Sequence, residues 1–274
     1  MNSKSDISLD RLAALVPDGA MLAVPKDSSG VAMAATRELL RRSVRGLHLL
    51  CVPTGGIQAD ILIGAGAVRT IETSAVTMGE YGPAPYFTAE MRESGIEIKD
   101  STCPAVYAAL QAAEKGLPFI PLRGLIGTDV LKHRQDWKVI DNPFASGDPI
   151  VVLPALRPDF ALFHTPLADR YGNVFVGRQR DLMTMAHAAS HTLVTVENIT
   201  DDNLLDDPAR AGSVLPSFYV SAIALAPRGA WPLALWDVYP DDEAAIARYL
   251  ALARTDDGFA RFLSEWPDGE RAAA

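Results

Sequence analysis

The sequence predicts an α/β protein with a mostly parallel sheet that is covered by helices on both faces. Short apolar runs of strand length recur along its 274 residues, and segments with helical periodicity separate them. Strands that are apolar throughout are typical of a sheet buried on both sides. A chain of this length can bury one large core, so we expect a single domain over residues 1–274, with a disordered tail over about 267–274.

The first part of the chain alternates between helix and strand. Ser8 can cap a helix over residues 9–16, and Pro17-Asp18-Gly19 then turns the chain into a strand. A later helix has Pro104 in its first turn and Gly116 at its C-terminal cap. We expect strands over residues 20–24, 47–52, 68–76 and 96–98, and helices over residues 30–43, 58–63, 85–94 and 104–115.

The remaining chain continues this pattern after one interruption. Residues 123–149 show no clear periodicity, and such a stretch is either functional or a solvated insertion. Around it, we expect strands over residues 119–122, 150–153, 160–163, 192–196 and 219–225, and helices over residues 181–189, 243–254 and 257–265.

The composition excludes several classes of partner. The chain has 34 acidic and 25 basic residues and a net charge of −9, so it lacks the basic face that nucleic acid or an anionic membrane requires. It contains no run of 18 apolar residues, and its N-terminus is polar, so we expect neither a membrane span nor a signal peptide. Cys51 and Cys103 are expected to be the reduced thiols of a cytoplasmic protein.

Common motifs for nucleotide, metal and acyl chemistry are missing from the sequence. It has no G-x-x-x-x-G-K-[ST], no H-E-x-x-H and no G-x-S-x-G. His187 and His191 are four residues apart, but His191 falls where a helix gives way to a strand, so no metal site is expected. The Gly64-Ala65-Gly66 segment lacks the third glycine of a dinucleotide fingerprint and is interpreted as a tight turn.

One known family is similar to the chain from about residue 8 to residue 266. The matching segments keep their order, and they include Asp60-Ile61-Leu62-Ile63-Gly64-Ala65-Gly66, Ile140-Asp141-Asn142-Pro143-Phe144, Gly172-Asn173-Val174 and Leu225-Ala226-Pro227-Arg228-Gly229-Ala230. On these residues the chain resembles the A-type (alpha) subunits of class I coenzyme A transferases, such as glutaconate CoA-transferase, and the related subunit of a steroid-ring CoA hydrolase. The resemblance implies the CoA-transferase (NagB/RpiA/CoA transferase-like) fold.

The same resemblance implies an enzyme subunit that moves CoA between an acyl-CoA thioester and a carboxylic acid. In this family the attacking glutamate lies on the B-type (beta) subunit, so we expect activity only in a hetero-oligomer with that partner. Coenzyme A takes part as the substrate thioester, and no metal is implied. The alternatives are a subunit of a CoA-thioester ring-opening hydrolase, a non-catalytic module that binds acyl-CoA or a sugar phosphate, and a sugar-phosphate isomerase.

The first predicted substrate-binding segment follows the first strand. Ser28, Ser29 and Gly30 stand at an expected helix start, where free N–H groups bind anions. The family commonly has a pair of glycines in this loop. Residues 24–31 lack that pair, and this departure from the family pattern indicates a divergent branch.

The second predicted segment lies in the aperiodic stretch. The resemblance assigns Arg123, Gly127 and Thr128 to the family loop that approaches the acyl group. Arg123 either pairs with a substrate carboxylate or makes a surface ion pair. No catalytic residue is expected on this chain, although Glu80, in an E-x-G motif that resembles the nucleophile motif, is a candidate. Glu197, at a strand end, is interpreted as a structural carboxylate.

Overall fold

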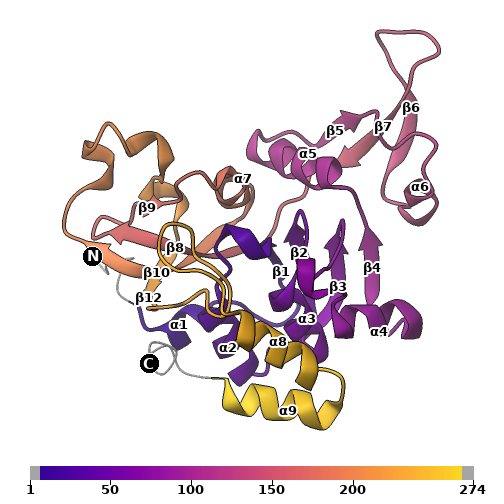
Figure 1. Cartoon of the computed structure of the whole chain (residues 1–274). Coiled ribbons are helices and arrows are strands. Elements are labelled where there is room, and N and C mark those ends of the chain that lie inside the picture. The colour runs from indigo at the N-terminus through magenta and orange to yellow at the C-terminus, as the bar shows by residue number, and fades with distance from the viewer. Residues whose placement is uncertain (1–6, 267–274) are drawn as a thin grey trace.

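The structure is a computed structural model that describes residues 7–266, and a nine-stranded sheet forms its centre (Figure 1). Seven strands of this sheet are parallel, and β1 (Met21–Pro25) lies between two groups of them. On one side follow β2 (Leu47–Val52), β3 (Val68–Thr73) and β4 (Glu97–Asp100). On the other side follow β8 (Phe160–Asp169), β10 (His191–Thr200) and β12 (Ala222–Leu225). Two short strands, β9 (Val174–Phe175) and β11 (Val214–Leu215), extend β8 in antiparallel pairing.

The position of β1 creates a topological switch point. The chain proceeds outward from β1 to β2, β3 and β4, and later returns to the other side of β1 with β8. Connections at the C-terminal ends of β1 and β8 therefore lead away from each other. Ligands of open parallel sheets bind in the crevice outside the strand ends at such a point.

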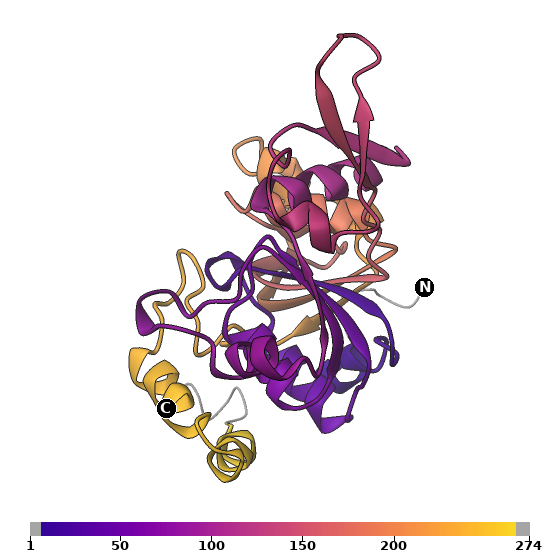
Figure 2. The ribbon, with the colours of Figure 1, turned by 90° about the vertical axis from the view of Figure 1, so that its right-hand side faces the viewer.

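Helices cover both faces of the sheet, as the sequence predicts. One buried cluster takes residues from α1 (Leu9–Ala13), α2 (Met33–Arg41), α3 (Ile57–Gly64), α4 (Pro85–Glu93), α8 (Glu243–Leu252) and α9 (Asp256–Glu265). The cluster on the opposite face takes residues from α5 (Cys103–Glu114) and α7 (Arg180–Ala188). Figure 2 shows α8 and α9 at the end of the molecule away from the second, smaller sheet.

The smaller sheet is antiparallel and stands beyond the C-terminal ends of β2, β3 and β4 (Figures 1 and 2). It contains β5 (Phe119–Leu122), β7 (Pro149–Pro154) and β6 (Lys138–Asp141), in that order, and α6 (Val130–His133) precedes β6. A separate small core holds it on α5, formed by Ala105, Leu125, Trp137, Val151 and Leu153. The aperiodic residues 123–149 thus build part of a second sheet.

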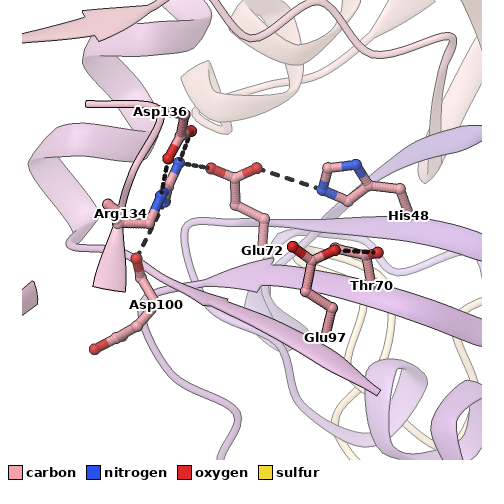
Figure 3. A network of polar contacts seen from close by, with 7 residues as sticks. All are labelled: His48, Thr70, Glu72, Glu97, Asp100, Arg134 and Asp136. Atoms are coloured by element: carbon pink, nitrogen blue, oxygen red, sulfur yellow. Dashed lines mark hydrogen bonds and ion pairs between the residues drawn. The ribbon is translucent and has the colours of Figure 1, made fainter. Parts of the chain in front are cut away.

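A buried ion pair joins this smaller sheet to the main one (Figure 3). Arg134, just after α6, donates to Glu72 Oε1 on β3 at 2.7 Å, and each side chain is only 2% exposed. The guanidinium also donates to Asp136 and to the backbone oxygen of Asp100, and His48 Nε2 lies 3.4 Å from the other Glu72 oxygen. Burial alone would raise the pKa of Glu72, but its contacts with His48 and Arg134 hold that pKa below the usual value.

Some expected boundaries are wrong. The first helix ends at Ala13, and the Ser8 side chain makes no capping hydrogen bond. The helix expected from residue 30 begins at Met33, because Asp27–Ser29 form a 3-10 turn and Gly30 is left-handed. The strand expected from residue 219 begins at Ala222, after another 3-10 turn. Residues 267–274, expected to be a disordered tail, lie outside the described residues. Within residues 7–266, none of the helices has both the length and the apolar character needed to cross a bilayer.

Candidate functional site

A cavity of about 620 Å³ lies at the C-terminal ends of β1, β2 and β3, beside the switch point. The loops after these strands contribute residues 26–28, residues 54 and 55, and residues 77–81. The opposite wall comes from residues between 233 and 246, including Leu233, Trp236 and Ile246. The cavity therefore combines apolar walls with loop segments, which suits a ligand with a largely apolar portion.

The structure brings Ser28, Ser29 and Gly30 to the edge of this cavity, although only Ser28 lines it. The Ser29 N–H donates to the Lys26 oxygen at 2.9 Å and its hydroxyl to Gln179 at 3.1 Å, so both groups are already paired. Gly30 adopts φ +80°, and its oxygen accepts from the His164 N–H at 2.7 Å. A Cβ on Gly30 would come within 2.1 Å of the His164 oxygen. The loop is therefore fixed against β8 at a position that only glycine fits.

Asp27 is a residue of the site that the sequence did not single out. Its Oδ2 accepts from the Ile57 N–H at 3.1 Å, at the start of α3. The carboxylate packs against Gly56, where an added Cβ would lie 2.0 Å from Oδ2. Its Oδ1 is buried and has no hydrogen-bond partner among residues 7–266. Burial, reinforced by the charge of Asp241, raises the pKa of Asp27 to about 7. The sequence offered one indication of Asp27, because this loop has an acidic residue where the family commonly has glycines.

Acidic side chains dominate the charged lining of the cavity. Glu80 lies in the turn Gly79–Tyr81 after β3 and lines the cavity, as do Asp241 and Glu243 from the opposite wall. Lys26 is the cation in the lining. No described residue donates a hydrogen bond to the Glu80 carboxylate, so nothing in the described chain orients it as a nucleophile would require. The described residues contain no group of three or more His, Cys, Asp or Glu that could hold a metal ion.

A buried network fixes the opposite wall. His164 on β8 lies 2.8 Å from Thr195 Oγ1 through Nδ1 and 2.8 Å from Glu197 Oε1 through Nε2. Glu197 also accepts from the Arg228 N–H at 2.7 Å and from the Tyr239 hydroxyl at 2.7 Å. Burial alone would raise the pKa of Glu197, but these hydrogen bonds hold it below the usual value. Glu197 thus ties the segment that carries Trp236 to β10, and the geometry fits the structural role expected for it.

The structure places the second predicted segment elsewhere. Arg123 lines a separate apolar cavity of about 480 Å³ on the smaller sheet, together with Phe119, Ile140 and Phe144. Its guanidinium donates to both oxygens of Asp148, through Nε at 3.0 Å and through Nη2, and both partners are at least partly exposed. Gly127 has φ +82°, and the Thr128 hydroxyl donates to the Leu125 oxygen at 2.8 Å. None of these three predicted residues lines the cavity beside β1.

Comparisons with known proteins agree with this architecture. The family model described as coenzyme A transferase matches residues 7–224. The crystal structure of glutaconate coenzyme A-transferase from Acidaminococcus fermentans superposes with a TM-score of 0.88 at 26% identity, covering 95% of this chain and 87% of that chain. A decarboxylase AibA/AibB variant superposes with a TM-score of 0.83 at 30% identity, covering 94% of this chain and 98% of that chain.

Sequence relatives give the same family. An uncharacterized protein of Archaeoglobus fulgidus is 34% identical over 87% of this chain, and the chain spans 53% of that protein's length. The A-type subunit of the 3-oxoadipate CoA-transferase from Pseudomonas knackmussii is 30% identical over 93% of this chain and 90% of the relative. The cholesterol ring-cleaving hydrolase IpdA subunit of Rhodococcus jostii is 30% identical over 86% of this chain and 82% of the relative. The chain therefore belongs to the coenzyme A transferase family, as an A-type subunit of class I.

Proposed function

We propose that this chain forms one half of a CoA-thioester site and that a B-type subunit completes it with the nucleophilic glutamate. The cavity at the ends of β1, β2 and β3 carries this proposal, because its apolar walls suit an acyl group while its own glutamate, Glu80, has no orienting hydrogen bond from the described chain. Relatives named as A-type subunits of CoA-transferases support the pairing.

In the proposed reaction the partner's carboxylate attacks the thioester carbon, and the C–S bond breaks to release CoA thiolate and an acyl–glutamyl anhydride. The thiolate then attacks the glutamyl carbonyl of that anhydride, giving an enzyme–CoA thioester and the free donor acid. An acceptor carboxylate reverses these two steps and leaves as the new CoA ester. This chain holds the acyl portion beside residues 26–28, where Lys26 and Ser28 carry side-chain groups that can donate to the oxyanion.

A thioester hydrolase is the second candidate function. The acidic lining favours it, since Glu80, Asp241 and Glu243 oppose the entry of an acceptor carboxylate more than the entry of water. The 30% identity to a cholesterol ring-cleaving hydrolase subunit also supports it. In that case water resolves the acyl intermediate and no acceptor acid is consumed.

Co-expression with a B-type chain separates these candidates. The complex should exchange CoA between a thioester and an added acid, whereas each chain alone should show no exchange. Release of free thiol without any acceptor would favour the hydrolase. Full transferase activity from this chain alone would overturn the two-subunit proposal, and a Glu80→Gln variant would then test whether Glu80 is the nucleophile.

A further inference from the structure

A second cavity, of about 330 Å³, adjoins the loop after β1. Its other walls come from α5 and from the start of α7. Lys26 lines both this cavity and the one at the ends of β1, β2 and β3. The Ser29 hydroxyl donates at 3.1 Å to Gln179, which lines the second cavity, so the loop is fixed against it. The two cavities are therefore neighbours that share the loop after β1.

Cations dominate the second cavity, in contrast to the first. Its charged lining consists of Lys26, Arg178 and Arg180 together with one acid, Asp181. Both arginines are exposed, whereas Asp181 is only 8% exposed. The positive groups, rather than the carboxylate, are therefore accessible to a ligand that enters this cavity.

The fold leaves most of this positive charge unused. No described residue accepts a hydrogen bond from the side chain of Lys26 or Arg178, and neither forms an ion pair within the described chain. Arg180 donates through Nη1 to the Gly212 oxygen at 3.2 Å, and its Nε and Nη2 have no described partner. By contrast, Arg123 donates to a carboxylate. In a chain with a net charge of −9, unpaired cations that converge on one cavity indicate a binding site for an anion.

Phosphate groups match the chemistry of this cavity. Guanidinium groups bind phosphate oxygens through paired N–H donors, and an ammonium group adds a compact positive charge. A CoA thioester carries its phosphates at the far end of the pantetheine arm, so they bind outside the cavity that holds the acyl group. The second cavity meets this requirement, because it adjoins the first at Lys26.

We propose that Lys26, Arg178 and Arg180 form a binding site for the phosphate groups of the CoA thioester. This inference rests on the proposed CoA-thioester function. It assigns the two ends of the ligand to two adjacent cavities of opposite charge. The first cavity repels phosphates through its acidic lining and the second attracts them, so the charges fix the direction in which the ligand lies.

The test compares two thioesters that share an acyl group, butyryl-CoA and butyryl-pantetheine, of which the second lacks the phosphates. Calorimetry measures their binding to the complex with the B-type subunit. Arg178→Ala should weaken the binding of butyryl-CoA about tenfold, as expected for the loss of one charged hydrogen-bonding group. It should leave the binding of butyryl-pantetheine unchanged. Added salt should weaken butyryl-CoA binding more in the native complex than in the variant.

Two further variants serve as controls. Arg254→Ala removes the same charge from an exposed position between α8 and α9 that lines neither cavity, so it should not alter the binding of either ester. Arg178→Lys keeps the charge and should retain most of the affinity for butyryl-CoA. Glucose 6-phosphate, titrated into the same complex, distinguishes the phosphates of CoA from a free sugar phosphate and should bind far more weakly than butyryl-CoA.

The outcomes separate the phosphate site from the function on which it rests. An equal loss for both esters in Arg178→Ala, or equal affinity of the native complex for both, would refute the phosphate site and leave the thioester function standing. Glucose 6-phosphate that binds as tightly as butyryl-CoA would assign the cations to a free sugar phosphate and overturn the inference as well. If neither ester binds the native complex, the proposed function fails, and the phosphate site fails with it.

Discussion

Arg134 and Glu72 are 62 residues apart in sequence, yet their side chains meet at 2.7 Å with both almost fully buried. The pair joins the segment just after α6 to β3 (Figure 3). Taking two charges out of water is costly, so this contact is stable only because Asp136 and the Asp100 oxygen accept from the guanidinium as well, while His48 Nε2 lies 3.4 Å from the other Glu72 oxygen.

We predict that Glu72→Gln destabilises the protein by about 3 kcal/mol, because it leaves the buried Arg134 charge with Asp136 as its remaining carboxylate. Urea unfolding measures the loss. Arg123→Ala, which breaks the more exposed pair with Asp148, is the matched control and should cost less than about 1 kcal/mol. Equal losses in the two variants would contradict the role given to burial.

Gly30→Ala should be severely destabilising. Its Cβ would lie 2.1 Å from the His164 backbone oxygen, and the residue has φ +80°. Gly66→Ala is the comparison, since Gly66 has φ +67° but open space around it, so only the backbone strain of about 1–2 kcal/mol applies. Thermal unfolding of both variants should place Gly30→Ala well below Gly66→Ala, and similar melting temperatures would disprove the steric argument.

Tyr239→Phe should loosen the wall that carries Trp236. It removes the 2.7 Å hydrogen bond to Glu197 and the acceptor for the Ala230 N–H, and we expect a loss of about 1–3 kcal/mol. In the complex with the B-type subunit, the KM of the Tyr239→Phe variant for a thioester should rise. The control is Tyr171→Phe at an exposed position, which should leave both the stability and the KM unchanged. A stable variant with an unaltered KM would show that the network does not shape the cavity.

Asp60 should make stability depend on pH. Its carboxyl is buried, accepts from the Phe87 N–H at 2.8 Å and the Tyr249 hydroxyl at 2.6 Å, and burial raises its pKa from 3.8 to about 6. Because the pKa of Asp60 is higher in the folded than in the unfolded protein, its protonated carboxyl stabilises the fold fully below pH 3.8. This stabilisation is lost as the pH rises through 6. Relative to Asp60→Asn, the native protein should lose up to about 3 kcal/mol between pH 4 and pH 7. Parallel stability curves for the two proteins would refute this.

Local patterns predicted the main sheet well and the smaller one poorly. The expected strand over residues 47–52 coincides with β2, because that strand is almost wholly buried and hence apolar throughout. β6 escaped notice since all four of its residues, Lys138–Asp141, are exposed and show no alternation. Its α6 neighbour has four residues, too few for periodicity to appear.

The residues of the candidate site likewise differ in how well local sequence predicted them. Ser28 and Glu80 were predicted from their loops, and both line the cavity. Arg123 was assigned by resemblance alone, and its pairing with Asp148 across 25 residues could not be recognised from spacing. The environment of Asp27 likewise depends on Ile57, Gly56 and Asp241, which come together only in the folded chain.

The coupling of Arg134 to Glu72 also constrains how relatives of this chain can diverge. Replacing either residue first passes through an intermediate with an unmatched charge in the protein interior, which selection for stability opposes. Positions 72 and 134 are therefore expected to change in concert, and chains that carry an apolar residue at one should carry a non-ionic residue at the other.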